Sequence, residues 1–129
     1  MTMKTPVWFA LAIMFSACAH DFGLMKLDEQ VNGYGAAIRW NQFKKATEYL
    51  TSPPQRSPDW ARLKETKVTA YRVLSRERSP SGSVMTQNVE IGYILPGSVV
   101  EKTLTDNQRW HYDDDRNRWL LDSGLPGLN

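Results

Sequence analysis

The chain has 129 residues, of which 41% are hydrophobic and 23% charged, and this fits one folded domain rather than a chain disordered throughout. The formal net charge is only +2, with basic and acidic residues interspersed, so nucleic-acid binding, which needs a clustered basic face, is not expected. The single cysteine excludes an internal disulfide framework.

The first predicted element is an export signal over residues 1–17. Lys4 precedes an apolar run from Pro6 to Ala17, and the run ends in small residues. This order of basic, apolar and small residues is typical of a secretory signal. The run spans residues 6–17, whereas a membrane-spanning helix takes about 20 residues. We therefore predict a cleaved signal, with an uncleaved inner-membrane segment over 6–17 as the alternative.

The end of this segment, Phe15-Ser16-Ala17-Cys18, resembles the lipobox of bacterial lipoproteins, usually Leu-Ala/Ser-Gly/Ala-Cys. Phe15 departs from the commonest residue. In that family a diacylglycerol is joined to the cysteine sulfur, which needs a nucleophilic thiol, and the signal is cut just before it. The resemblance implies a lipid anchor at Cys18, and Ala19 in place of Asp implies an outer-membrane protein facing the periplasm. A plain signal cut after Ala17, with an unmodified cysteine, is the alternative.

A tether over 18–27 and a single domain over 28–129 are predicted to follow. Apolar residues with helical spacing indicate helices over 28–40 and 42–50, separated by a bend at Trp40-Asn41, where Asn41 breaks one helix and caps the next. Those residues are Val31, Tyr34, Gly35 and Ile38, then Phe43, Ala46 and Leu50. Pro53 and Pro54 end the second helix, and Pro58 opens a short helical turn over 59–64.

The remainder is β-rich. Strand patterns lie near 68–74, 89–95, 100–112 and 118–121, and turn signals separate them at 79–82, 96–98 and 113–117. In the third run, polar residues at 102, 106 and 108 interrupt the apolar alternation, which predicts a bulge or a partly wet face. Helices followed by an antiparallel meander predict an α+β fold, with two helices covering one face of the sheet.

The segments 34–46 and 109–121 resemble the helical opening and the closing hairpin of the nuclear-transport-factor-2-like fold, also called SnoaL-like or cystatin-like. The resemblance covers roughly residues 28–124 and implies a curved sheet with a cone between helices and sheet. Enzymes of that group place a carboxylate and Tyr or His inside the cone, whereas many relatives are binding or assembly modules. The fold alone does not decide between them.

Aromatic residues are the candidate lining of a pocket, although core filling is the favoured interpretation for aromatics at regular spacing. They are Tyr34, Trp40, Tyr71, Trp110, Tyr112 and Trp119. His111 is the best acid–base candidate, but its parity is opposite to that of Trp110 and Tyr112, so it is expected to face solvent. The run Asp113-Asp114-Asp115 is interpreted as a polar turn. No catalytic residue, metal or cofactor is assigned.

The leading functional hypothesis is a membrane-tethered, non-enzymatic binding or assembly module of the cell envelope, which dimerises through its sheet or binds an envelope protein. A small-molecule carrier or an isomerase- or hydratase-type enzyme using the cone, with a small apolar ligand, is the second hypothesis. An inner-membrane protein that keeps residues 6–17 is the third. The mature N-terminus, measured by mass spectrometry, separates the first from the third.

Overall fold

A computed structural model describes residues 14–129, with side chains from Lys26 onward. Residues 1–13, and with them most of the predicted signal segment, lie outside the described residues. The backbone of Cys18 falls in the first helix, but its side chain is also outside the described part.

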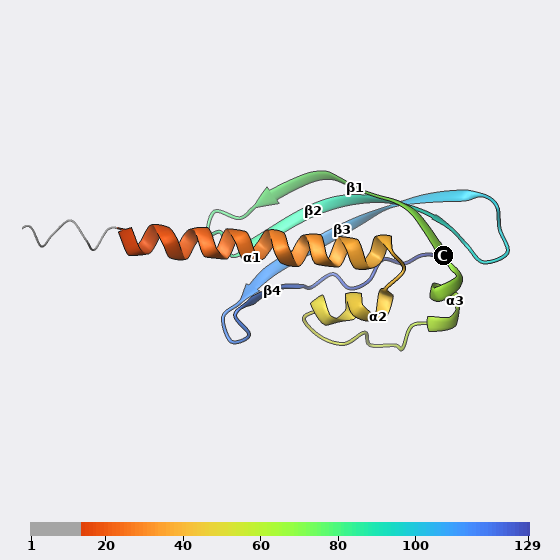
Figure 1. The fold of residues 1–129 in the computed structure, drawn as a ribbon, viewed down its shortest axis with the longest axis horizontal. Helices are drawn as coiled ribbons and strands as arrows, with labels where there is room; N and C mark the ends of the chain where they lie inside the picture. The colour runs from red at the N-terminus through yellow and green to blue at the C-terminus, as the bar shows by residue number, and fades with distance from the viewer. Residues whose placement is uncertain (1–13) are drawn as a thin grey trace, which may run out of the picture.

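One long helix, α1 (Met14–Arg39), lies along one face of a four-stranded sheet (Figure 1). Its sheet-facing residues recur at intervals of three and four: Leu27, Val31, Tyr34 and Ile38 are each at most 3% exposed. The apolar face predicted for this helix is therefore confirmed. The helix begins at Met14 rather than at residue 28, so the segment 18–27 that we predicted as a tether is helical. Within residues 14–129, no helix combines the length and the apolar character needed to cross a membrane.

The bend predicted at Trp40-Asn41 is present and has a definite geometry. Asn41 has a φ of 59°, its N–H donates to the carbonyl of Ile38, and the N–H of Gln42 donates to that of Ala37. This is the Schellman arrangement, in which a left-handed residue closes a helix. We predicted Asn41 as the N-cap of the next helix, and this is wrong, because the N-cap is Gln42. The amide of Asn41 instead bonds the start of the first strand.

Short helical pieces follow. The predicted second helix is present as α2 (Phe43–Ala46), extended by a 3-10 turn, η1 (Thr47–Tyr49). A Pro-rich loop leads to α3 (Trp60–Glu65), whose N-cap, Asp59, accepts a hydrogen bond from the backbone N–H of Arg62. Phe43, Ala46 and Leu50 are buried, so this segment also contributes to the core.

The sheet is the predicted antiparallel meander, in the order β1-β2-β3-β4. The strands are β1 (Lys67–Arg78), β2 (Val84–Ile94), β3 (Glu101–Asp113) and β4 (Arg118–Leu121). We predicted either a bulge or a partly wet face for the third strand, and the continuous pairing of β2 with β3 excludes the bulge there. Register shifts occur in β1 instead, between Val68 and Ala70 and between Val73 and Ser75. The first half of β3 is largely exposed, as expected for a partly wet strand.

Candidate functional site

A buried amide organises the helix-facing side of the sheet. Gln108, on β3, is 2% exposed. Its Nε2 donates to Tyr71 Oη at 2.9 Å and to Asp106 Oδ2 at 3.0 Å, and its Oε1 accepts from Gln87 Nε2 at 2.8 Å and from Trp110 Nε1 at 3.1 Å. Because an indole N–H can only donate, the contact with Trp110 fixes which end of the amide is the oxygen. All four hydrogen-bonding positions of the amide are therefore filled.

Strand alternation and register bring these groups together. Residues 106, 108 and 110 share one face of β3, since successive side chains point to opposite faces. Gln87 lies directly across from Gln108 in the β2–β3 register. Gln87 Oε1 accepts from Arg76 Nε at 3.1 Å, and Arg76 contacts Asp28 of α1 at 3.3 Å. The network thus connects three strands to the helix.

The hydroxyl of Tyr34 lies in this interior without a hydrogen-bond partner among the described residues. Tyr34 is fully buried, and its ring meets that of Trp110 edge to face, with centroids 5.5 Å apart. Burial, and then the negative charge of Asp106, raise the pKa of the Tyr34 hydroxyl well above its ordinary value. Tyr34 therefore stays neutral at physiological pH.

Asp106 and Tyr71 form the half-buried end of the network. Burial raises the pKa of Tyr71 to about 12, against the opposing effect of its hydrogen bond with Gln108. Burial also raises the pKa of Asp106, and the hydrogen bond from Gln108 opposes the shift. The arrangement sets a carboxylate of raised basicity near two neutral phenols. Such a set is able to accept a proton at Asp106 and to donate hydrogen bonds from the tyrosines.

A groove of about 290 Å³ between α1 and β1 opens onto this network. Tyr71 and Trp40 both line it, and Trp40 is 69% exposed, with the Arg39 guanidinium 5.0 Å from its ring centroid. Gly35 makes the close approach possible, because a Cβ built there would lie 2.8 Å from Tyr71 Cε1. Gly35 thus lets the helix pack against a ring of the sheet.

The structure divides the six aromatic residues predicted as a pocket. Trp40 and Tyr71 line the groove, whereas Tyr34, Trp110 and Trp119 are at most 1% exposed and fill the core. Tyr112 is half-buried and packs edge-on against Trp119 at 5.7 Å. Two polar members of the network, Asp106 and Gln108, were among the residues that interrupted the apolar alternation of the third strand. That interruption was their only signal in the sequence.

His111 is paired away from this site. Its Nδ1 lies 2.8 Å from Asp122 Oδ1, and Arg109 donates to the other oxygen of the same carboxylate at 2.7 Å. The aspartate run at 113–115 lies at the β3–β4 turn, where Asp113 accepts hydrogen bonds from two backbone N–H groups. These bonds, first that from residue 116, lower the pKa of Asp113. Among the side chains that the structure describes, from Lys26 onward, no group of three His, Cys, Asp or Glu could hold a metal ion.

The architecture defines a small α+β protein in which a long helix covers a four-stranded antiparallel sheet. Comparison of the chain with protein-family models, with curated proteins and with solved structures gave no match. The functional argument therefore depends on the residues themselves.

Proposed function

We propose that this protein is a bacterial envelope lipoprotein whose α+β domain is a non-enzymatic binding or assembly module. The observation that carries the proposal is the lipobox-like segment ending at Cys18, the only cysteine in the chain. Acyl chains bind bilayers through about 0.8 kcal/mol per buried CH₂, so a diacylated and further acylated cysteine is a durable anchor. We propose that this anchor lies in the outer membrane and that the domain faces the periplasm.

The packing of the interior supports a module that binds at its surface. Tyr34, Gln108 and Trp110 fill the space between α1 and the sheet, and each is at most 2% exposed. Ligand pockets need concave, accessible volume, and the two grooves considered among the described residues both open at the surface. A helix along a curved antiparallel sheet (Figure 1) also supports the finer proposal that the domain is nuclear-transport-factor-2-like.

Metabolic labelling with palmitate tests the anchor. The wild-type chain is expected to incorporate label and to sediment with membranes, whereas Cys18→Ser is expected to lose both. Mass spectrometry of the mature N-terminus should give a lipid-modified Cys18. An unlabelled wild-type protein with a free thiol would contradict the lipoprotein assignment.

Photocrosslinking from the exposed Val73 of β1 tests the binding module in intact cells, with the exposed Asn107 of β3 as the control position. A discrete adduct from position 73, absent from position 107, is expected. Adduct mass separates a second copy of the chain from another envelope protein. Diffuse, equal labelling from both positions would count against a specific interaction surface on β1.

A second candidate function has one observation in its favour. Asp106, with its raised pKa, and Tyr71 stand at the end of the buried network, and Tyr71 borders the groove. A carrier or an isomerase- or hydratase-type enzyme acting on a small apolar ligand would use these groups. Chemical shifts of Tyr71 and Trp40 on titration with small carbonyl compounds test this, and unchanged shifts at millimolar ligand would reject it.

A further inference from the structure

The part of the chain that connects the end of α1 to the start of β1 forms a second groove, separate from the groove and the network described above. It lies between α2 and α3 and has a volume of about 600 Å³, within the usual range for small-molecule sites. Its apolar part comprises Phe43, Trp60 and Leu63, and its lysines are Lys44, Lys45 and Lys64. The groove thus combines an apolar surface with three cations.

The three lysines are exposed and free of acidic partners. None of them takes part in any of the ion pairs or side-chain hydrogen bonds found among the described residues. The ammonium group of Lys44 lies 5.6 Å from the ring centroid of Trp60, a cation–π contact that holds it beside the indole. Three like charges around one groove repel one another, and an anion bound among them would relieve that repulsion.

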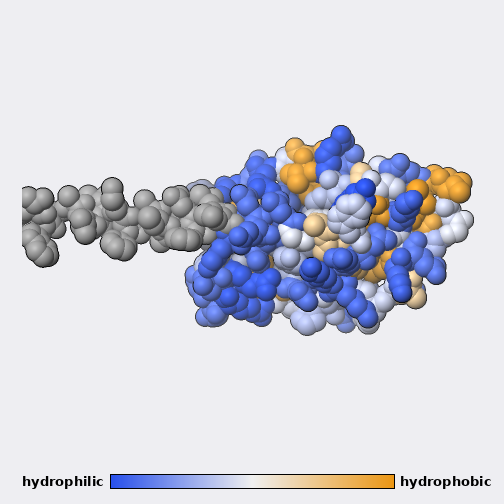
Figure 2. Space-filling model, viewed as in Figure 1, coloured by the Kyte–Doolittle hydropathy of each residue, from blue (hydrophilic) through white to orange (hydrophobic). Residues whose placement is uncertain are grey.

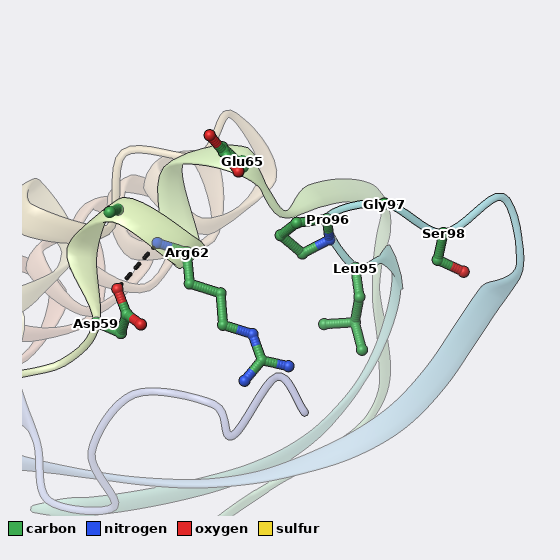
Figure 3. Close-up of a pocket in the computed structure, with 8 residues that line it drawn as sticks. Asp59, Arg62, Glu65, Leu95, Pro96, Gly97 and Ser98 are labelled. Carbon is green, nitrogen blue, oxygen red and sulfur yellow. Dashed lines mark hydrogen bonds between the residues drawn. The ribbon is translucent and has the colours of Figure 1, made fainter.

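The neighbouring groove provides a contrast. It lies between α3 and the turn at 95–98, and Figure 3 shows Asp59, Arg62 and Glu65 on the α3 side of it. Asp59 and Glu65 line it together with Arg62, so both signs of charge are present. Among the four grooves compared, all formed by described residues, the α2–α3 groove alone has lysine as its sole charged residue type.

We propose that the α2–α3 groove binds an organic phosphate, in which an anionic group joined to a ring or an apolar body sits among the lysines. The phosphate accepts hydrogen bonds from the ammonium groups, and the body lies against Trp60 and Leu63. The same chemistry is offered by a soluble organic phosphate and by the headgroup of an anionic phospholipid. This assignment does not depend on the lipid anchor and extends the binding role proposed above.

Two-dimensional NMR of the full chain in an uncharged detergent tests the site, with the indole N–H of Trp60 as the reporter. Phenyl phosphate is expected to shift this signal at lower concentration than inorganic phosphate or the neutral phenyl glucoside. Short-chain phosphatidylglycerol, compared with phosphatidylcholine, forms the lipid arm. Binding of phenyl phosphate alone identifies a soluble ligand, and binding of phosphatidylglycerol alone identifies a lipid headgroup.

Charge reversal locates the binding. The double variant K44E/K64E is expected to weaken phosphate binding by about tenfold or more, because two charge-assisted contacts are replaced by repulsion. The control R56E/K67E makes the same change in net charge at exposed residues outside the groove, and its affinity should stay within about twofold of wild type. Circular dichroism verifies that each variant is folded.

Three results would overturn the proposal. They are equal weakening in both double variants, binding of phenyl glucoside as tight as that of phenyl phosphate, and phosphate binding that leaves the Trp60 signal unmoved. If K44E/K64E fails to fold, K45Q/K64Q, which removes charge without reversing it, takes its place, with an expected loss of about threefold or more.

Discussion

Replacing Tyr34 by Phe is expected to stabilise the protein. The Tyr34 hydroxyl is buried with no hydrogen-bond partner among the described residues. Leaving such a group unsatisfied costs about 1–3 kcal/mol, and Phe removes the group while keeping the ring and its edge-to-face contact with Trp110. Because the oxygen's small volume is left empty, we expect a net gain of about 1–2 kcal/mol in the free energy of unfolding.

Tyr71→Phe is the matched control and should have the opposite sign. Its hydroxyl accepts a hydrogen bond from Gln108 Nε2 at 2.9 Å, and Phe would leave that buried donor with one partner fewer. A loss of about 1 kcal/mol is expected. The two substitutions delete the same atom from the same residue type, once outside and once inside the hydrogen-bonded network, so the difference in sign reports hydrogen bonding rather than side-chain size.

Equilibrium unfolding in urea measures both variants, with an unchanged slope taken as the sign that the unfolded state is unaltered. Tyr34→Phe should move the midpoint to higher urea and Tyr71→Phe to lower urea. If Tyr34→Phe destabilises the protein as much as Tyr71→Phe does, the hydroxyl of Tyr34 has a partner in solution, and the account of an unsatisfied group is wrong.

Two further substitutions test the packing and the electrostatics of the same region. Gly35→Ala should destabilise the protein by about 1 kcal/mol or more, because the alanine Cβ would lie 2.8 Å from the ring of Tyr71. This cost exceeds the gain from the better helix propensity of alanine. A raised midpoint of thermal unfolding would contradict this close packing. For Asp106, burial raises the folded-state pKa above the ordinary 3.8, so the folded protein binds the proton more tightly than the unfolded chain. The contribution of this proton to the free energy of unfolding is fully present below the pKa of Asp106 in the unfolded chain. It is lost as the pH rises through the pKa of Asp106 in the folded protein. Asp106→Asn should therefore increase stability more at pH 7 than at pH 4 in urea unfolding, and an equal or larger gain at pH 4 would refute the raised pKa.

Local patterns in the sequence were sufficient for most of the architecture. Alternation over residues 89–95 predicted β2, and helical spacing at Val31, Tyr34 and Ile38 predicted the buried face of α1. Turn residues divided the strands correctly, since Gly82 and Gly97 adopt φ values of 77° and 75° that favour glycine. Such signals involve residues close in the chain, and the order of the sheet follows from them because a meander needs only neighbouring pairs.

The polar network could not be predicted because its partners are distant in the chain. Gln108 bonds Tyr71 and Gln87, which lie 37 and 21 residues away. From β3 alone, Gln108 and Asp106 read as a disturbance of the apolar face. The extent of β1 was underestimated for a related reason: two register shifts change which face its side chains occupy, and they conceal the alternation.

The amide of Asn41 joins the end of α1 to the start of β1, donating to the carbonyl of Thr66 and accepting from the N–H of Val68 at 3.3 Å. The two ends of the segment 42–65 are therefore held close together by the hydrogen bonds of Asn41. Changing the length of such a loop costs little, about 0.6 kcal/mol for each doubling. If Phe43, Ala46 and Leu50 still pack in the core, the other residues of this segment can change during evolution without a change in the sheet. The lysines of the groove are among them.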